Sequence, residues 1–141
     1  MSGVFLCPNA NPMIGRKDYA MKRPLAYVTA PWTEDARENE MMAAKYCRQL
    51  YDAGYSPICP AMFLPVFLDD SVPQEHNDSL TMAQDYLRRS RVLVVCGSYV
   101  NESMKNDIAL AERLRIAATT LDGIMVVSGH GREKAKRGGR I

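Results

Sequence analysis

The sequence is poor in cysteine and lacks the cysteine pairs that bind metals or form redox centres. Its 141 residues include 4 cysteines, and none stands in a C-x-x-C motif or at a zinc-like spacing from histidine. Three of the four lie inside apolar runs. This usage is typical of reduced core residues in a cytosolic protein. The cysteines are Cys7, Cys47, Cys59 and Cys96.

Long apolar segments and nucleotide-binding fingerprints are missing as well. No run approaches the roughly 18 residues that a membrane span needs, and the start of the chain lacks the pattern of a signal peptide. We therefore expect a soluble, cytoplasmic protein that does not contact membranes. G-x-G-x-x-G and G-x-x-x-x-G-K-[ST] do not occur, which argues against dinucleotide and P-loop chemistry. We expect no cofactor and no metal.

A strong excess of charge of one sign is also absent, since the formal net charge is only +2. The basic residues gather at the end, in GREKAKRGGRI, where Glu133 is the one acidic residue. A solvated chain end is the commoner explanation of such a run. This segment is the one place where we expect contact with nucleic acid to be possible.

Length and a hydrophobic content of 47% suit a single domain with one core. Residues 1–23 contain prolines, glycine and charges without periodicity, and are predicted to form an irregular arm. Residues 24–128 carry the organised pattern, and residues 129–141 form the basic tail. No internal repeat is present.

Short β-prone runs alternate with helical patterns along residues 24–128. Strands are predicted in PLAYVTAP, YSPICP, RVLVVCG, IAATTL and GIMVV, and helices in the stretch from Thr33 to Gly54, in PQEHNDSLTMAQDYLRRS and in SMKNDIALAERLR. The proline-interrupted AMFLPVFLDD is predicted to be a loop over the core. The alternation predicts a doubly wound α/β fold, Rossmann-like or flavodoxin-like, with a parallel sheet of about 4 to 5 strands and helices on both faces.

In such a fold the loops that follow the strands converge at the carboxyl edge of the sheet, where ligands bind. Here these loops contain APWTED, CPAMF and GSYVNES. A tryptophan beside a helix N-terminus can stack a planar ring and hold an anion, although an aromatic plug over the core edge explains it equally well. The residues that we expect to contact a ligand are Ala30, Pro31, Trp32, Pro60, Asn101, Ser103 and Met104.

Three segments together resemble the nucleoside 2-deoxyribosyltransferase-like superfamily. They are AYVTAPWTEDARENEMMAAKYCRQLYDAGYSPICPAMFLPVFLDD, DYLRRSRVLVVCG and ESMKNDIALAERLRI. The chain most resembles a small branch of that superfamily found in bacteria, phages and mobile elements. Its pattern is Y-x-x-x-P-Y/W, then N-x-x-x-A, G-x-x-P-x-x-P and G-M-x-x-E-I, and the match covers about residues 24 to 120. The single motifs are loose, but their order and spacing are fairly specific.

The resemblance implies transfer of a 2-deoxyribosyl group or hydrolysis of an N-glycosidic bond. Asp107 then stands in the place of the Glu nucleophile, Tyr27 in that of its Tyr partner, and Asp85 in that of the acid that handles the base. Asn101 replaces a sugar-binding Asp, and Ser103 replaces the glycine before Met104. Asp is shorter than Glu by roughly 1.5 Å, and a shift of about 1 Å can cost a hundredfold in rate.

Simpler explanations exist for each of these residues. Tyr27 suits a core strand, Asp85 can pair with Arg88 or Arg89 one helical turn away, and Asp107 near a helix start is favoured by the helix dipole. Two hypotheses remain. One is an enzyme of nucleoside or nucleotide N-glycosidic bonds, and the other is a protein that binds or sequesters a nucleotide-like ligand, or blocks a partner, without turnover. By analogy with the superfamily we expect a homo-oligomer.

Overall fold

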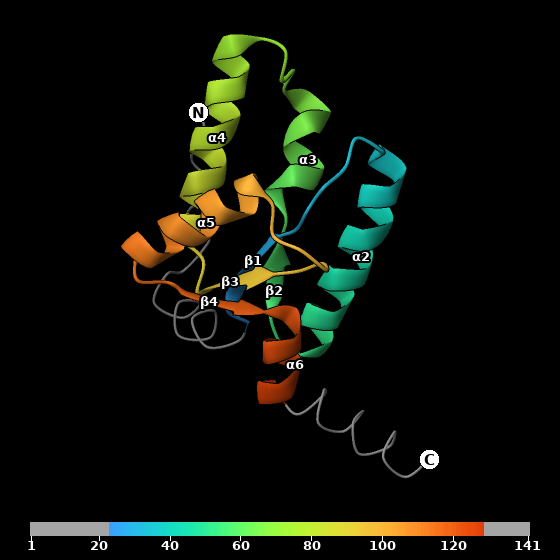
Figure 1. Ribbon diagram of the computed structural model, residues 1–141, viewed down its shortest axis with the longest axis vertical. Coiled ribbons are helices and arrows are strands. Elements are labelled where there is room, and N and C mark those ends of the chain that lie inside the picture. Colours follow the sequence, from blue (N-terminus) through green and yellow to red (C-terminus); the bar gives the residue numbers. More distant parts are fainter. Residues whose placement is uncertain (1–22, 129–141) are drawn as a thin grey trace, which may run out of the picture.

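The computed structural model describes residues 23–128, which form a parallel sheet flanked by helices (Figure 1). Within this part of the chain the strands are β1 (Leu25–Thr29), β2 (Ser56–Ile58), β3 (Val92–Val95) and β4 (Ala117–Thr120). Their order is β2-β1-β3-β4, and every pairing is parallel. The predicted doubly wound α/β fold is confirmed. The predicted arm, apart from Arg23, and the predicted tail lie outside the described residues.

Helices cover both faces of the sheet (Figure 1). Helices α2 (Ala36–Asp52) and α6 (Leu121–Ser128) cover one face, and α4 (Pro73–Arg88) and α5 (Glu102–Arg113) cover the other. The alternation of side chains along β1 supplies both cores, because Ala26 and Val28 pack towards α2 while Tyr27 packs towards α4 and α5. Strand β1 is therefore buried on both faces, as expected for a central parallel strand.

Helix α2 lies within the stretch from Thr33 to Gly54 that was predicted to be helical. Asp35 caps α2, because its Oδ1 accepts the backbone N–H groups of Arg37 and Glu38 at 3.0 and 3.1 Å. Tyr46 and Leu50, four residues apart on one face of the helix, are buried. Beyond the helix, Gly54 has a φ of +98°, a conformation that glycine adopts readily.

The prediction of a loop for AMFLPVFLDD is wrong, because most of this segment belongs to helix α3 (Pro60–Phe67). Pro60 stands in the first turn, where its missing N–H costs nothing. Pro65 lies near the end of this short helix, so it removes only one intrahelical hydrogen bond. Burial of Leu64, which is 3% exposed, outweighs that loss.

The strand predicted for GIMVV is also wrong, since these residues belong to helix α6. A short apolar run fits a buried strand and a buried helix equally well. Leu121 and Ile124 stand three residues apart, on one face of the helix, and both are buried in the core beneath α2. Thr120 supports the first turn, because its Oγ1 accepts the backbone N–H of Gly123 at 3.0 Å.

The cysteines that can be described are free thiols of the core. Cys59 and Cys96 are buried, and Cys47 is half-buried beside them. Burial raises the pKa of Cys59 and of Cys96 to about 12, so both stay protonated and unreactive. In residues 23–128, no helix has both the length and the apolar character that crossing a membrane would require.

Candidate functional site

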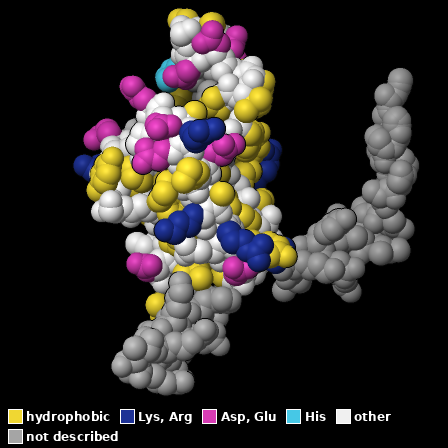
Figure 2. Space-filling model, turned by 90° about the vertical axis from the view of Figure 1, so that its right-hand side faces the viewer, with side chains coloured by type: hydrophobic (Ala, Val, Ile, Leu, Met, Phe, Trp, Pro, Cys, Tyr) yellow, Lys and Arg dark blue, Asp and Glu magenta, His cyan; other side chains and the backbone are white. Residues whose placement is uncertain are grey.

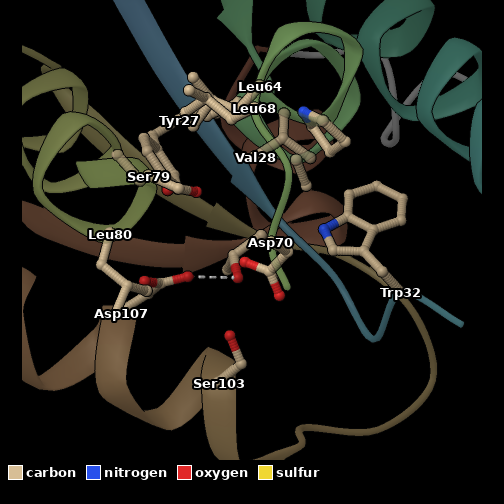
Figure 3. Close-up of a pocket in the computed structure, with 15 residues that line it drawn as sticks. Tyr27, Val28, Trp32, Leu64, Leu68, Asp70, Ser79, Leu80, Ser103 and Asp107 are labelled. Atoms are coloured by element: carbon tan, nitrogen blue, oxygen red, sulfur yellow. Dashed lines mark hydrogen bonds between the residues drawn. The ribbon is translucent and has the colours of Figure 1, made fainter. Parts of the chain in front are cut away.

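A cavity of about 440 Å³ opens beside the carboxyl end of β1, on the face covered by α4 and α5 (Figure 3). The chain runs from β1 outward to β2 and then returns to β3 on the other side of β1, so the sheet changes winding direction between β1 and β3. Open α/β sheets bind ligands at this switch point. The volume falls in the range of small-molecule sites.

Asp107 reaches the cavity from the second turn of α5. Its Oδ2 accepts a hydrogen bond of 2.8 Å from Oγ1 of Thr29, the last residue of β1 (Figure 3). Burial raises the pKa of the Asp107 carboxyl group, and the hydrogen bond from Thr29 partly offsets this by lowering it. Thr29 therefore holds a half-buried carboxylate in a fixed position at the end of the sheet.

Tyr27 lines the same cavity, two residues before Thr29 and on the same face of β1 (Figure 3). The side chain is 6% exposed. Burial raises the pKa of the Tyr27 hydroxyl, and the negative charge of Asp107 raises it further. Its hydroxyl group thus remains protonated and able to donate. The predicted pair of Tyr27 and Asp107 is brought together in one cavity.

Trp32 also borders this cavity, together with the predicted ligand contacts Pro60 and Ser103. In addition Trp32 borders a second cavity of about 310 Å³, which contains the predicted contacts Ala30 and Pro31. The indole ring is inclined at 54° to the ring of Tyr46, with 6.4 Å between the ring centres. Trp32 is therefore a shared wall between two neighbouring cavities.

Asp85, Asn101 and Met104 line neither cavity. Asp85 forms an ion pair with Arg88 through a 3.0 Å contact, as the simpler explanation of this residue predicted. Ala83 faces the cavity, and Asp85 stands two residues after it on the same helix. Two residues turn a helix by about 200°, so Asp85 points away from the cavity. Asn101 instead caps α5 by accepting the N–H of Met104 at 2.9 Å, and Met104 is completely buried.

Sequence reasoning missed Asp70, which lies between α3 and α4 and borders the cavity (Figure 3). Its Oδ1 is 2.7 Å from Nδ1 of His76 in the first turns of α4. Sequence reasoning also missed Thr29, although its place two residues after Tyr27 on a predicted strand was a usable signal. For Asp70 no such signal existed, because the helix that precedes it was predicted to be a loop.

No group of three or more histidine, cysteine or acidic side chains within residues 23–128 is arranged to hold a metal ion. The titratable groups that do face the cavity are Tyr27, Asp70 and Asp107. They suit hydrogen bonding, proton transfer and nucleophilic attack by a carboxylate.

These features define an open, doubly wound α/β protein with a carboxylate-bearing cavity at its switch point. The chain belongs to the family described as Domain of unknown function (DUF7768), whose model matches residues 24–121. No curated protein matches the chain.

The raised pKa of Asp107 predicts that this carboxyl group lowers stability at neutral pH. Between the ordinary value of 3.8 and the raised value, the folded chain keeps a proton that the unfolded chain has lost. The free energy of unfolding therefore falls as pH rises through this window, and the loss is complete above the raised pKa. We expect Asp107→Asn, which can still accept from Thr29, to be more stable than the parent at pH 7.

Urea unfolding at a series of pH values checks this prediction. The advantage of Asp107→Asn should shrink as pH falls towards and below 3.8, where Asp107 is neutral in both states. A stability difference that does not change with pH would show that the charge of Asp107 is not its source.

Proposed function

We propose that this protein acts on the N-glycosidic bond of a nucleoside or nucleotide, transferring the 2-deoxyribosyl group to another base or to water. The observation that carries the proposal is the meeting of Asp107 and Tyr27 in one cavity of about 440 Å³ at the carboxyl end of β1. The resemblance to the nucleoside 2-deoxyribosyltransferase-like superfamily supports the same assignment. The cavity is large enough for a compact nucleoside.

In the first step an oxygen of Asp107 attacks C1′ of the sugar, and the electrons of the C1′–N bond leave with the base. We assign the attack to Oδ1, because Oδ2 is held by Thr29 at 2.8 Å. The product of this step is a glycosyl ester on Asp107. In the second step a second base or a water molecule attacks C1′ and releases the carboxylate.

Tyr27 and Trp32 position the substrate in this scheme. The raised pKa of Tyr27, caused mainly by burial, keeps the phenol protonated, so it donates a hydrogen bond to the sugar or to the carboxylate. Trp32 presents a half-buried indole at the wall of the cavity, which suits stacking against the base. Both residues act by orientation, which is a large part of the rate advantage in such reactions.

Asp70 is the candidate for protonating the leaving base. It is the second carboxyl group that borders the cavity, whereas Asp85 is paired with Arg88 outside it. The 2.7 Å contact between Asp70 Oδ1 and His76 Nδ1 lets the two groups share a proton in this scheme. That proton passes to the base nitrogen as the C1′–N bond breaks, and the water molecule or incoming base of the second step returns a proton to the pair.

A binding protein without turnover is the second candidate. It is favoured by the position of Asp85 outside the cavity, which removes the acid that the resemblance implies. Ligand-induced increases in melting temperature without any release of base would support this candidate over the enzyme.

The test of the enzymatic function is incubation with a panel of deoxynucleosides, ribonucleosides and their 5′-monophosphates, with chromatographic detection of free base. We expect release of base from at least one deoxy compound, and exchange when a second base is added. A complete absence of release across the panel would contradict the proposal.

Two matched substitutions distinguish Asp70 from Asp85 as the acid. We expect Asp70→Asn to lower kcat/KM for natural nucleosides by about 10²- to 10⁴-fold, and Asp85→Asn to change it by less than about twofold, because its carboxylate lies at the surface. A 4-nitrophenyl 2-deoxyriboside, whose leaving group needs no proton, should be cleaved by Asp70→Asn at nearly the parental rate. Loss of natural activity in Asp85→Asn alone would reverse the assignment.

We also propose a cytoplasmic location, which the free core cysteines support. The resemblance supports a homo-oligomeric state, which is checked by light scattering of the purified chain. A nucleoside-like small molecule is the proposed partner.

A further inference from the structure

The charged side chains among the described residues that line the cavity are all acidic. Asp70 and Asp107 both border the cavity, and the described residues that line it include no Lys, Arg or His (Figure 3). The remaining wall consists of apolar side chains and of hydroxyl groups such as those of Ser79 and Ser103. A ligand in this cavity therefore meets two carboxyl groups.

The small size of the cavity keeps any ligand close to both carboxyl groups. A sphere of 440 Å³ would be about 9 Å across, which is less than the Debye length of about 10 Å at 0.1 M salt. Every group of a bound nucleoside thus lies within reach of the charges on Asp70 and Asp107. Solvent ions screen this interaction only partly.

The region around Asp70 extends the negative charge. Acidic side chains gather in the upper part of the molecule in Figure 2, the end where α3 and α4 join in Figure 1. The segment between α3 and the first turns of α4 carries Asp69, Asp70, Glu75 and Asp78. The second cavity beyond Trp32 contributes another carboxylate, Glu38, and no cationic side chain of the described residues.

Two positive features act against this field, and neither cancels it. The N-terminus of α5 carries a partial charge of about +0.5, but Glu102 in its first turn opposes it. His76 contacts Asp70 and neutralises that carboxylate only when the imidazole is protonated. When the imidazole is neutral, the field at the cavity is negative.

We infer that the cavity accepts uncharged nucleosides and rejects their 5′-monophosphates, with Asp70 at its border as the residue that sets this preference. The inference deepens the proposed function, because it names the substrate class of the same cavity. It concerns binding, so it can be tested whether or not the protein turns its ligand over.

The experiment measures equilibrium binding at pH 8 and low salt, using deoxyadenosine, its 5′-monophosphate and the dimethyl ester of that monophosphate. The ester has the bulk of the phosphate without its charge. We expect deoxyadenosine and the ester to bind with similar Kd, and the monophosphate to bind at least about tenfold more weakly. This gap should narrow at 0.5 M salt, where screening is strong.

Matched variants locate the source of the preference. Asp70→Asn should narrow the gap between nucleoside and monophosphate several-fold. Asp52→Asn makes the same change of charge at the exposed end of α2, outside the cavity, and should leave the gap unchanged. Monophosphate binding as tight as nucleoside binding would overturn the inference. An unchanged gap in Asp70→Asn would overturn the role of Asp70.

The outcomes separate this inference from the proposed function. Base release together with equal binding of nucleoside and monophosphate would reject the preference for uncharged nucleosides and support the enzymatic function. Selective nucleoside binding without any base release would reject the enzymatic function and support the preference. Failure of all three compounds to bind would reject the inference, and base release across the nucleoside panel would still decide on the proposed enzyme.

Discussion

Replacement of Asp107 by alanine is expected to lower the rate of base release by at least about a thousandfold, which corresponds to about 4 kcal/mol of lost transition-state stabilisation. The proposed reaction passes through a covalent ester on this carboxylate, and no other carboxylate of the described residues shares its position beside Thr29. Removal of a nucleophile commonly costs a large part of the total rate enhancement. Chromatographic assay of free base, with the substrate that the parent cleaves best, measures the effect.

The isosteric variant Asp107→Asn separates chemistry from folding. Its amide oxygen can still accept from Thr29 Oγ1, and the variant is expected to be at least as stable as the parent at pH 7. An equal loss of activity in both variants would therefore reflect the missing nucleophile. A 2-fluoro-2-deoxyribosyl substrate should leave an adduct on the α5 peptide of the parent, detectable by mass spectrometry. Base release by Asp107→Ala at the parental rate would show that Asp107 is not the nucleophile.

The strands and three of the helices were predictable because their signals are local. RVLVVCG and PLAYVTAP are short β-prone runs closed by glycine or proline, and the stripe of Met42, Tyr46 and Leu50 has helical spacing. The two errors, α3 and α6, share a cause. Both are short and apolar on nearly all sides, so their periodicity carries no information, and contacts with the rest of the core decide their conformation.

The candidate site was predictable only as far as it depends on strand order and alternation. The resemblance pointed to Tyr27 on β1 and to Asp107 on the helix after β3, and both residues line one cavity. The position of Asp85 could be predicted only from the rotation of α4 about its axis, and that of Asp70 only from the path of the chain before α4. A helix turns by about 100° per residue, so an error of two residues in phase moves a side chain from the cavity to the surface.

Substitution of Gly97 by alanine is expected to lower the free energy of unfolding by about 2 to 5 kcal/mol. Gly97 follows β3 with a φ of +97°, which an alanine adopts only with strain. A Cβ at this position would lie 2.6 Å from Cδ of Pro31 and 3.0 Å from its Cγ. The loop from β1 to α2 would have to move, and Trp32 would move with it. Weaker nucleoside binding should accompany the loss of stability.

Gly54→Ala is the matched control, because Gly54 has nearly the same φ, +98°, but no atom within 4 Å of the added Cβ. This variant carries the backbone strain alone, about 1 to 2 kcal/mol, and should bind ligand as the parent does. The difference between the two variants in urea unfolding measures the close approach of the β1 and β3 loops at the switch point. Equal destabilisation by both substitutions would show that Pro31 can move away from the added Cβ at no cost in stability. Gly97 would then not fix the position of Trp32 at the cavity wall.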